Sequence, residues 1–269
     1  MIRVSSLDAG MLYAETPDMP MHTMGVIILE PPSRSIFEVL RGVIEERLHL
    51  LAPFRRRLLE SPLQLGDPHW IEDPEFSLAN HLRRAAIPAP GSMRELAEFV
   101  GDAASHLLDR SKPLWELQVV EGLEGGKVAI VAKIHHAAMD GGRLVALIGV
   151  LLDLVPDGRT IPLSGTEWTP DTEPSFLWFA ADTARVIATK PINALRAMAE
   201  VGATIAGSTR PQRGSDDSAA KLFEAPATPM NGALSPQRVV AMADVAFDDV
   251  RAIKNAFGTT VNDVVLAAS

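Results

Sequence analysis

The stretch between residues 113 and 142 limits the possible folds more than any other part of the sequence. A strand-like run over Leu117–Val120 is followed by the turn signal Gly125-Gly126 and a second run over Lys127–His135. Two such runs joined by paired glycines predict an antiparallel hairpin. Its second strand is apolar from Val128 to Ile134, which indicates that it is buried.

Helices and a further strand precede and follow this hairpin. Met24–Glu30 is a dense apolar run typical of a buried strand. Apolar residues at steps of three and four predict helices over Ser35–Leu51 and Ser92–Leu108, the second beginning with a Ser-x-x-Glu capping box. Arg143–Leu154 is a third predicted helix. The order strand, helix, helix, hairpin, helix indicates a mixed, layered α/β fold.

The composition changes after residue 155, where Pro, Thr, Ser and Ala become frequent. Within this part, Phe176–Phe179 is an amphipathic patch and Ala194–Ile205 has a helical pattern. Arg238–Phe247 is then predicted as a strand and Asp248–Phe257 as a helix. We therefore divide the chain into a lobe of residues 1–155, a helical and Pro-rich linker of residues 156–236, and the beginning of a second lobe at residues 237–269.

The last residues, Thr259–Ala268, begin another apolar periodic segment, and the sequence stops inside it without a capping signal. A natural domain seldom ends in this way. We therefore expect a truncated or cleaved chain.

The composition excludes several kinds of site. The 269 residues include no cysteine, which removes disulfides, thiolate zinc sites and a cysteine nucleophile. A net charge of −9 gives no basic footprint for nucleic acid. The sequence has neither a signal-peptide core at its start nor a run near the ~18 consecutive apolar residues of a membrane span. We expect a cytoplasmic protein with only peripheral contact with lipid.

The segment His135-His136-Ala137-Ala138-Met139-Asp140-Gly141 is the most informative motif. It lies where a buried strand meets glycines, a junction that places side chains at the mouth of a core. Consecutive residues of a strand point to opposite faces, so only one of His135 and His136 can face a given cavity. Asp140 lies four residues beyond His136 and can fix the loop, or orient the imidazole through an intermediary.

A histidine in this position suits the removal of a proton from an alcohol. Imidazole has an unperturbed pKa of ~6.5, and a well-placed general base accelerates a reaction by about 10²–10⁴-fold. The residues alone leave other interpretations open, of which a structural histidine pair is the most common. A metal site is disfavoured because adjacent histidines diverge and no third ligand stands nearby. A Ser-His-Asp hydrolase is disfavoured because the Gly-x-Ser-x-Gly elbow is missing.

Several motifs together resemble the bacterial wax ester synthase/diacylglycerol acyltransferase family, in its actinobacterial branch. In chain order they are Leu7–Gly10, Met19–His22, Pro113–Glu116, His135–Gly141, Thr228–Gly232 and Asn262–Val265. They extend over essentially the whole chain. The histidine motif alone is shared by a wider superfamily of acyltransferases and condensation domains, and the conjunction is much more specific.

The resemblance implies a two-lobed fold similar to chloramphenicol acetyltransferase, with the active site in a tunnel between the lobes. Each lobe is a mixed sheet flanked by helices, and this chain corresponds to the N-terminal lobe plus the start of the second. His136 matches the general base and His135 the less essential member of the pair. Asp140 matches the aspartate that shapes the site, and Gly141 matches the turn.

Two other motifs of the resemblance also have plain structural interpretations. Asn262 and Asp263 match a motif that supports the site or its helix, and their types equally suit a helix start. Pro113–Trp115 matches a motif that is more plausibly structural, and we expect Trp115 to pack in the core. We expect Phe176–Phe179 to pack against the core or between lobes rather than against lipid.

The reaction implied by the resemblance is transfer of a fatty acyl group from acyl-CoA to diacylglycerol, giving triacylglycerol. Alternatives are a long-chain alcohol as acceptor, giving a wax ester, an acyl-carrier protein as donor, or an inactive truncated lobe that binds lipid. No bound cofactor or metal is expected, because acyl-CoA is a co-substrate. The expected partners are the two substrates, the C-terminal half of the same protein as a second fragment, and the inner membrane face or lipid droplets.

Overall fold

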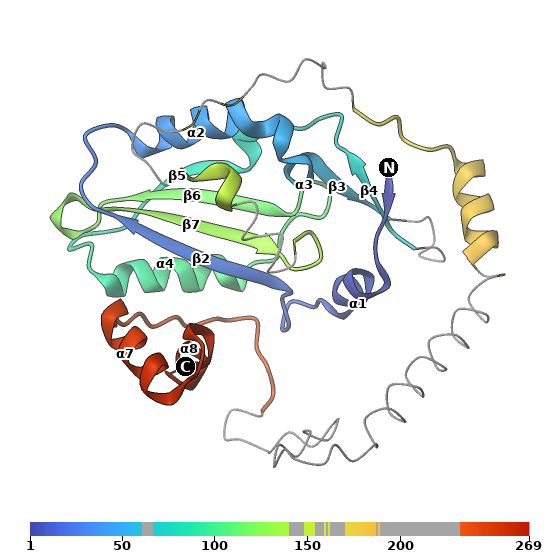
Figure 1. Cartoon of the computed structure of the whole chain (residues 1–269). Helices are drawn as coiled ribbons and strands as arrows, with labels where there is room; N and C mark the ends of the chain where they lie inside the picture. Colours follow the sequence, from blue (N-terminus) through green and yellow to red (C-terminus); the bar gives the residue numbers. More distant parts are fainter. Residues whose placement is uncertain are drawn as a thin grey trace, which may run out of the picture.

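A computed structural model describes residues 1–60, 67–139, 148–153, 159, 161, 170–186, 188 and 232–268. Its centre is a four-stranded sheet in the order β2-β7-β6-β5 (Figure 1). The strands are β2 (His22–Leu29), β5 (Leu82–Ala86), β6 (Trp115–Glu121) and β7 (Val128–His135). Strands β5 and β6 are parallel and the other neighbours antiparallel, so the sheet is mixed, as predicted.

Helices cover both faces of this sheet (Figure 1). Helix α2 (Ile36–Arg47) packs on one face, where its buried Ile44 joins side chains of β6 and β7. Helix α4 (Met93–Ser105) packs on the other, where Leu96 and Val100 meet the opposite set of strand side chains. The alternation of side chains along a strand separates these two cores.

A smaller antiparallel sheet, in the order β1-β4-β3, lies beside the large one (Figure 1). Its strands are β1 (Ile2–Arg3), β3 (Arg56–Leu59) and β4 (His69–Glu72). The remaining short elements are α1 (Ser6–Ala14), η1 (Leu48–Leu50), α3 (Ala52–Arg55), η3 (Leu78–Asn80) and η4 (Glu124–Gly126). Neither β5 nor any strand of this smaller sheet was predicted from the sequence.

The predicted hairpin and the predicted capping box are both confirmed. Strands β6 and β7 pair from Trp115 opposite Ile134, and the turn between them uses positive φ angles of 71° and 75° at Gly125 and Gly126. The backbone amide of Ser92 donates to Glu95 Oε2 at 2.8 Å, and the Ser92 hydroxyl oxygen accepts from the backbone at the start of α4.

The predicted strand over 238–247 is wrong, whereas the helix after it is confirmed. Residues 232–246 form no strand in the described structure, and α7 (Phe247–Phe257) begins where the strand was expected to end. The alternating pattern reflects burial instead, because Val240 and Met242 pack against the core beneath α4. Helix α8 (Val261–Ala268) follows, within the last apolar periodic segment of the sequence.

Two predicted helices lie wholly or partly outside the described residues. Ala194–Ile205 lies outside entirely, and of Arg143–Leu154 only residues 148–153 are described, with 148–151 helical. Residues 176–186 are also helical; there Phe179 is buried, as expected, but Phe176 and Leu177 are exposed. None of the helices within the described ranges is long and apolar enough to cross a membrane.

Candidate active site

The histidine motif begins at the end of β7, next to the start of β2. His135 is the last residue of β7 and pairs with His22 of β2. The backbone amide of His135 donates to the Leu114 carbonyl at 3.0 Å, and that of His136 donates to the Met21 carbonyl at 2.8 Å. Backbone hydrogen bonds from two neighbouring segments therefore fix the positions of both histidines.

The two histidine rings occupy different environments, in agreement with strand alternation. His135 is fully buried, whereas His136 is only partly buried. Nδ1 of His135 accepts a hydrogen bond from the backbone amide of Ala137 at 3.0 Å. In the neutral ring the proton must then reside on Nε2. The arrangement gives His135 an anchoring position inside the core.

The anchor of His135 is a buried carboxylate, Glu15, which follows α1. His135 Nε2 lies 3.3 Å from Glu15 Oε1, and the Glu15 side chain is 1% exposed. The same carboxylate oxygen accepts from the backbone amide of Met21 at 3.1 Å, and Oε2 accepts from Arg110 Nη2 at 3.0 Å. Burial by itself raises the pKa of Glu15, but its contacts with His135, Met21 and Arg110 outweigh this and lower the pKa to about 2.

Arg110 ties this carboxylate to the end of α1. Its Nη2 also donates to the Leu12 carbonyl at 2.5 Å, and its Nη1 donates to Glu60 at 3.3 Å. Neither Arg110 nor Glu15 was predicted from the sequence, because nothing local marks either residue as buried or paired. The only signal near Glu15 is its place between the two opening motifs of the family resemblance.

The ring of His136 is less enclosed than that of His135. Among the described residues, its buried Nδ1 has no hydrogen-bond partner, while the ring as a whole is partly exposed. The ring is therefore not sealed inside packed hydrocarbon. Asp140 and Gly141, the other predicted members of the motif, lie outside the described residues.

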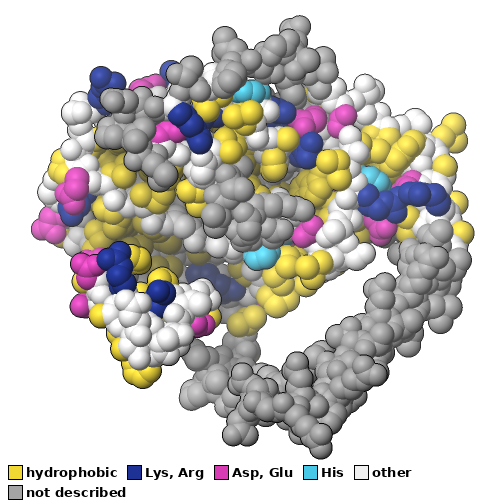
Figure 2. Space-filling model, in the orientation of Figure 1, with side chains coloured by type: hydrophobic (Ala, Val, Ile, Leu, Met, Phe, Trp, Pro, Cys, Tyr) yellow, Lys and Arg dark blue, Asp and Glu magenta, His cyan; other side chains and the backbone are white. Residues whose placement is uncertain are grey.

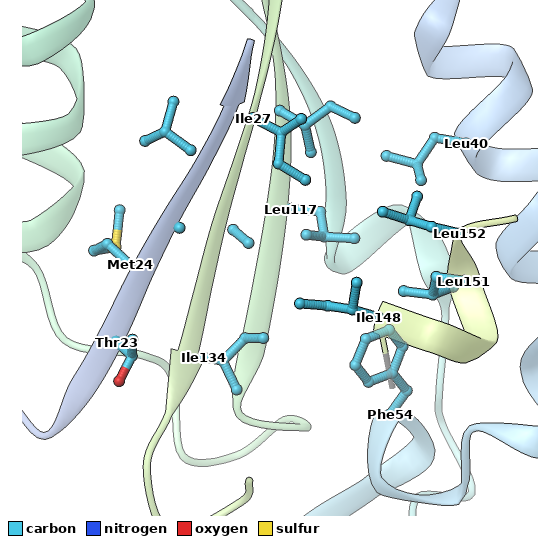
Figure 3. Close-up of a pocket in the computed structure, with 14 residues that line it drawn as sticks. Thr23, Met24, Ile27, Leu40, Phe54, Leu117, Ile134, Ile148, Leu151 and Leu152 are labelled. Atoms are coloured by element: carbon cyan, nitrogen blue, oxygen red, sulfur yellow. The ribbon is translucent and has the colours of Figure 1, made fainter. Parts of the chain in front are cut away.

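An apolar hollow of about 210 Å³ lies on one face of the large sheet, over β2 and β7 (Figure 3). Its floor includes Ile130, Ala132 and Ile134 of β7, which alternate along one face of the strand. His136 is the next residue in that alternation, two positions beyond Ile134. If the alternation continues one residue past the end of β7, His136 faces the same side of the sheet as the hollow.

Asn262 and Asp263 lie in the first turn of α8, and Asp263 takes part in the cap of that helix. Thr260 caps α8: its amide donates to Asp263 Oδ2 at 2.8 Å, and its hydroxyl oxygen accepts from the Asp263 amide at 3.1 Å. The backbone and hydroxyl hydrogen bonds from Thr260 lower the pKa of Asp263. Both motif residues are exposed, and α8 lies beyond α4 from the large sheet (Figure 1).

The Pro113–Trp115 motif is structural, as expected. Trp115 is 1% exposed and stacks on Phe54 with ring centroids 4.1 Å apart. Its indole Nε1 donates to the Phe54 carbonyl at 2.8 Å. The preceding Leu114 supplies the carbonyl that holds the His135 amide, so the motif also positions the end of β7. No group of three or more metal-ligating side chains is found among the described residues.

Comparison with known proteins identifies the family. The wax ester synthase/diacylglycerol acyltransferase catalytic domain matches residues 4–265. A Mycobacterium tuberculosis protein provisionally named a diacylglycerol O-acyltransferase is 39% identical over 279 residues, which cover 100% of this chain and 57% of the relative. A second protein of that organism, with the same provisional name, is 36% identical over 272 residues, covering 99% of this chain and 53% of the relative.

A solved structure agrees with these relatives. The wax ester synthase/diacylglycerol acyltransferase from Marinobacter aquaeolei matches with a TM-score of 0.61 and 28% identity, covering 98% of this chain and 57% of that one. The chain thus spans about half the length of the relatives it matches. The predicted resemblance and the predicted mixed α/β fold are both confirmed. This chain belongs to the family of the wax ester synthase/diacylglycerol acyltransferase catalytic domain.

Proposed function

We propose that the protein containing this chain is an acyl-CoA-dependent O-acyltransferase that esterifies diacylglycerol to triacylglycerol, with His136 as general base. The observation that carries the proposal is the state of His136, which is partly exposed and has a buried Nδ1 without a partner among the described residues. The names of the Mycobacterium tuberculosis relatives support diacylglycerol as acceptor. The apolar hollow on the same side of the sheet suits a lipid substrate.

In the proposed reaction, His136 takes the hydroxyl proton as the acceptor oxygen attacks the thioester carbonyl. The tetrahedral intermediate then expels the CoA thiolate, and the imidazolium returns the proton to it. The products are an ester and free CoA. A thioester needs no activation of its leaving group, so one properly placed base suffices. Such a base accelerates the reaction by about 10²–10⁴-fold. Acyl-CoA is a co-substrate, and the scheme needs no bound cofactor.

The other predicted site residues have supporting roles in this proposal. Glu15 anchors the ring of His135, and His135 in turn fixes the backbone from which His136 projects. From the family resemblance, the proposal assigns Asp140 to the shaping of the site and Gly141 to the turn of the motif. Asn262 and Asp263 act through α8, which Asp263 stabilises at its first turn.

The proposed division of the protein is a first lobe of residues 1–155, a linker of residues 156–236 and a second lobe that begins at residue 237. The relatives' additional length supports a C-terminal half that completes the second lobe and the tunnel. Contact with a membrane or lipid droplet would be peripheral. A long-chain alcohol is the second candidate acceptor, because the related Marinobacter aquaeolei protein carries wax ester synthase in its name.

The experiment compares His136→Ala and His135→Ala in the protein purified as it occurs in the cell. Intact-mass measurement first establishes whether a second polypeptide accompanies this chain. Palmitoyl-CoA is then supplied with diacylglycerol or with hexadecanol, and both CoA release and ester formation are measured. We expect His136→Ala to lower kcat by about 10²–10⁴-fold and His135→Ala to have the smaller effect. Full turnover by His136→Ala would refute the base assignment.

A further inference from the structure

The hollow beside β7 is bounded by the large sheet on one side and by residues 148–152 on the other. Ile148, Leu151 and Leu152 point toward the sheet from that segment, and Leu40 and Phe54 approach from α2 and α3 (Figure 3). Thr23 is the one polar side chain among the described residues that line it. A cavity with so few polar groups cannot bind the charged head of CoA, but it suits hydrocarbon.

A pair of small residues opens the hollow. Gly25 of β2 lies opposite Ala132 of β7, and both line the space. A Cβ atom built on Gly25 would meet no heavy atom within 4 Å. The neighbouring pairs on the same face are larger: Thr23 opposite Ile134, and Ile27 opposite Ile130. The missing side-chain volume between these pairs is what makes the hollow.

A buried arginine holds the opposite wall away from the sheet. Arg47 of α2 is 3% exposed and donates to the carbonyls of Val150 at 2.8 Å and Leu151 at 3.1 Å. It also binds Asp153 Oδ2 at 2.5 Å. These contacts hold Val150 and Leu151 through their backbone carbonyls and Asp153 through its side chain. A wall held in this way favours a pocket that is formed before a ligand binds.

The two ends of the hollow lie at different distances from His136 along the strands. Thr23 and Ile134 lie at the end nearest His136, whereas Ile27 and Ile130 lie farther along the strands. Ile27 is 42% exposed, so the far part opens toward solvent at the edge strand β2. His136 lies four positions beyond Ala132, which at strand spacing is about 13 Å. A long acyl chain with its reactive carbon at His136 can therefore extend over the Gly25–Ala132 pair.

On the side of the molecule that Figure 2 shows, hydrophobic side chains gather over the large sheet, with charged side chains around them.

We propose that the hollow binds one long hydrocarbon chain of a substrate, and that Gly25 and Ala132 set the chain length that fits. The direction of the chain rests on the proposed function of His136. The proposal that the hollow is a binding pocket depends only on its shape and its apolar lining.

The test measures binding of a chain-length series to Gly25→Val and Ala132→Val. Butyryl-CoA, octanoyl-CoA and palmitoyl-CoA are titrated by calorimetry without acceptor, so that the result does not depend on turnover. Each valine displaces roughly two methylenes of ligand, and we expect palmitoyl-CoA to bind about tenfold more weakly. The affinity for butyryl-CoA should change less than about twofold, which also shows that the variants are folded.

The matched control is Gly42→Val, in helix α2. A Cβ built at Gly42 likewise meets nothing within 4 Å, and this glycine does not line the hollow. Its affinities should equal those of the unaltered protein at every chain length. Thermal unfolding of all three variants checks that none has lost its fold.

A second arm separates the donor chain from the acceptor chain. Butanol, octanol and hexadecanol replace the acyl-CoA series. A loss of affinity confined to long acyl-CoA assigns the hollow to the acyl donor. A loss of affinity confined to long alcohols assigns it to the acceptor. Either result supports the proposal. Equal losses of affinity at every chain length, or no loss of affinity with either series of ligands, would overturn the proposal. A length-dependent loss in a protein that shows no acyl transfer would leave the pocket standing and refute only the proposed function.

Discussion

The Nε2 atom of His135 lies 3.3 Å from Oε1 of Glu15, and both side chains are at most 1% exposed. A carboxylate this deeply buried is costly unless hydrogen bonds compensate it, and Met21 and Arg110 complete its partners. The pair ties the start of the histidine motif to the segment after α1. The position of the candidate base therefore depends on a residue about 120 positions away in the sequence.

Replacing Glu15 by Gln should lower both stability and activity. The charge that pairs with Arg110 and His135 disappears while the shape is kept, and we expect a loss of about 1–3 kcal/mol in the free energy of unfolding. Because His135 would then be held less firmly, kcat for acyl transfer should fall with little change in KM. Denaturant unfolding and steady-state kinetics provide the two measurements.

The control for Glu15 is Glu60, the second carboxylate on Arg110. Its side chain is 44% exposed and lies 3.3 Å from Arg110 Nη1. Exposed ion pairs contribute little, so Glu60→Gln should change the free energy of unfolding by less than about 0.5 kcal/mol. If both variants behave alike, the anchoring role of Glu15 is wrong.

Stability should fall as the pH is lowered, in two ranges. Burial, with the charge of Lys133 next, lowers the pKa of His22 from 6.5 to about 4. The unfolded chain therefore takes up a proton near pH 6.5 that the native ring refuses until about pH 4, and stability falls between these values. Glu15 acts lower: its pKa of about 2, against 4.5, gives stability that is lost from pH 4.5 down to 2.

Unfolding midpoints measured across both ranges, from pH 8 down to about 2, test this assignment. We expect His22→Gln to reduce the fall in stability between pH 6.5 and 4 and to leave the fall at lower pH unchanged. The amide of glutamine does not titrate, but it can still donate to the Ala104 carbonyl that His22 contacts at 3.0 Å. An unchanged slope between pH 6.5 and 4 in this variant would show that another group is responsible.

Lys133→Met should destabilise the protein through helix α4. The Lys133 ammonium is buried and donates to the carbonyls of Ala103, at 2.9 Å, and His106, at the end of that helix. Burial lowers the pKa of Lys133. Methionine has a similar length and no donor, so the carbonyls lose their partner and we expect a cost of about 1–3 kcal/mol.

Lys127→Met serves as its control in chemical unfolding experiments. Lys127 pairs with Glu30 at 3.1 Å, and both side chains are at least 40% exposed. Its loss should cost less than about 0.5 kcal/mol. A Lys133→Met variant as stable as the unaltered protein would indicate that water satisfies the carbonyls at the end of α4.

Local patterns were sufficient for much of the fold. The hairpin of β6 and β7, the capping box of α4 and the helix α7 each depend on residues within a few positions of one another, which the sequence shows directly. The histidine motif belongs to the same class, because its strand and turn signals lie within one short stretch. The strands β1, β3 and β4 were missed because they are short and rich in polar residues. The strand wrongly predicted at 238–247 came from alternating apolar residues, of which Val240 and Met242 pack against the core without forming a strand.

Only the tertiary structure decided what surrounds the histidines. Glu15 meets His135, and Gly25 meets Ala132, across more than a hundred residues of chain. Such contacts depend on strand register and helix placement, which leave no periodic trace in the sequence. The sequence by itself therefore predicted the candidate base, and it determined the hairpin strand that the histidine motif follows. The tertiary structure decided which carboxylate anchors its neighbour, and where a hollow opens for a hydrocarbon chain.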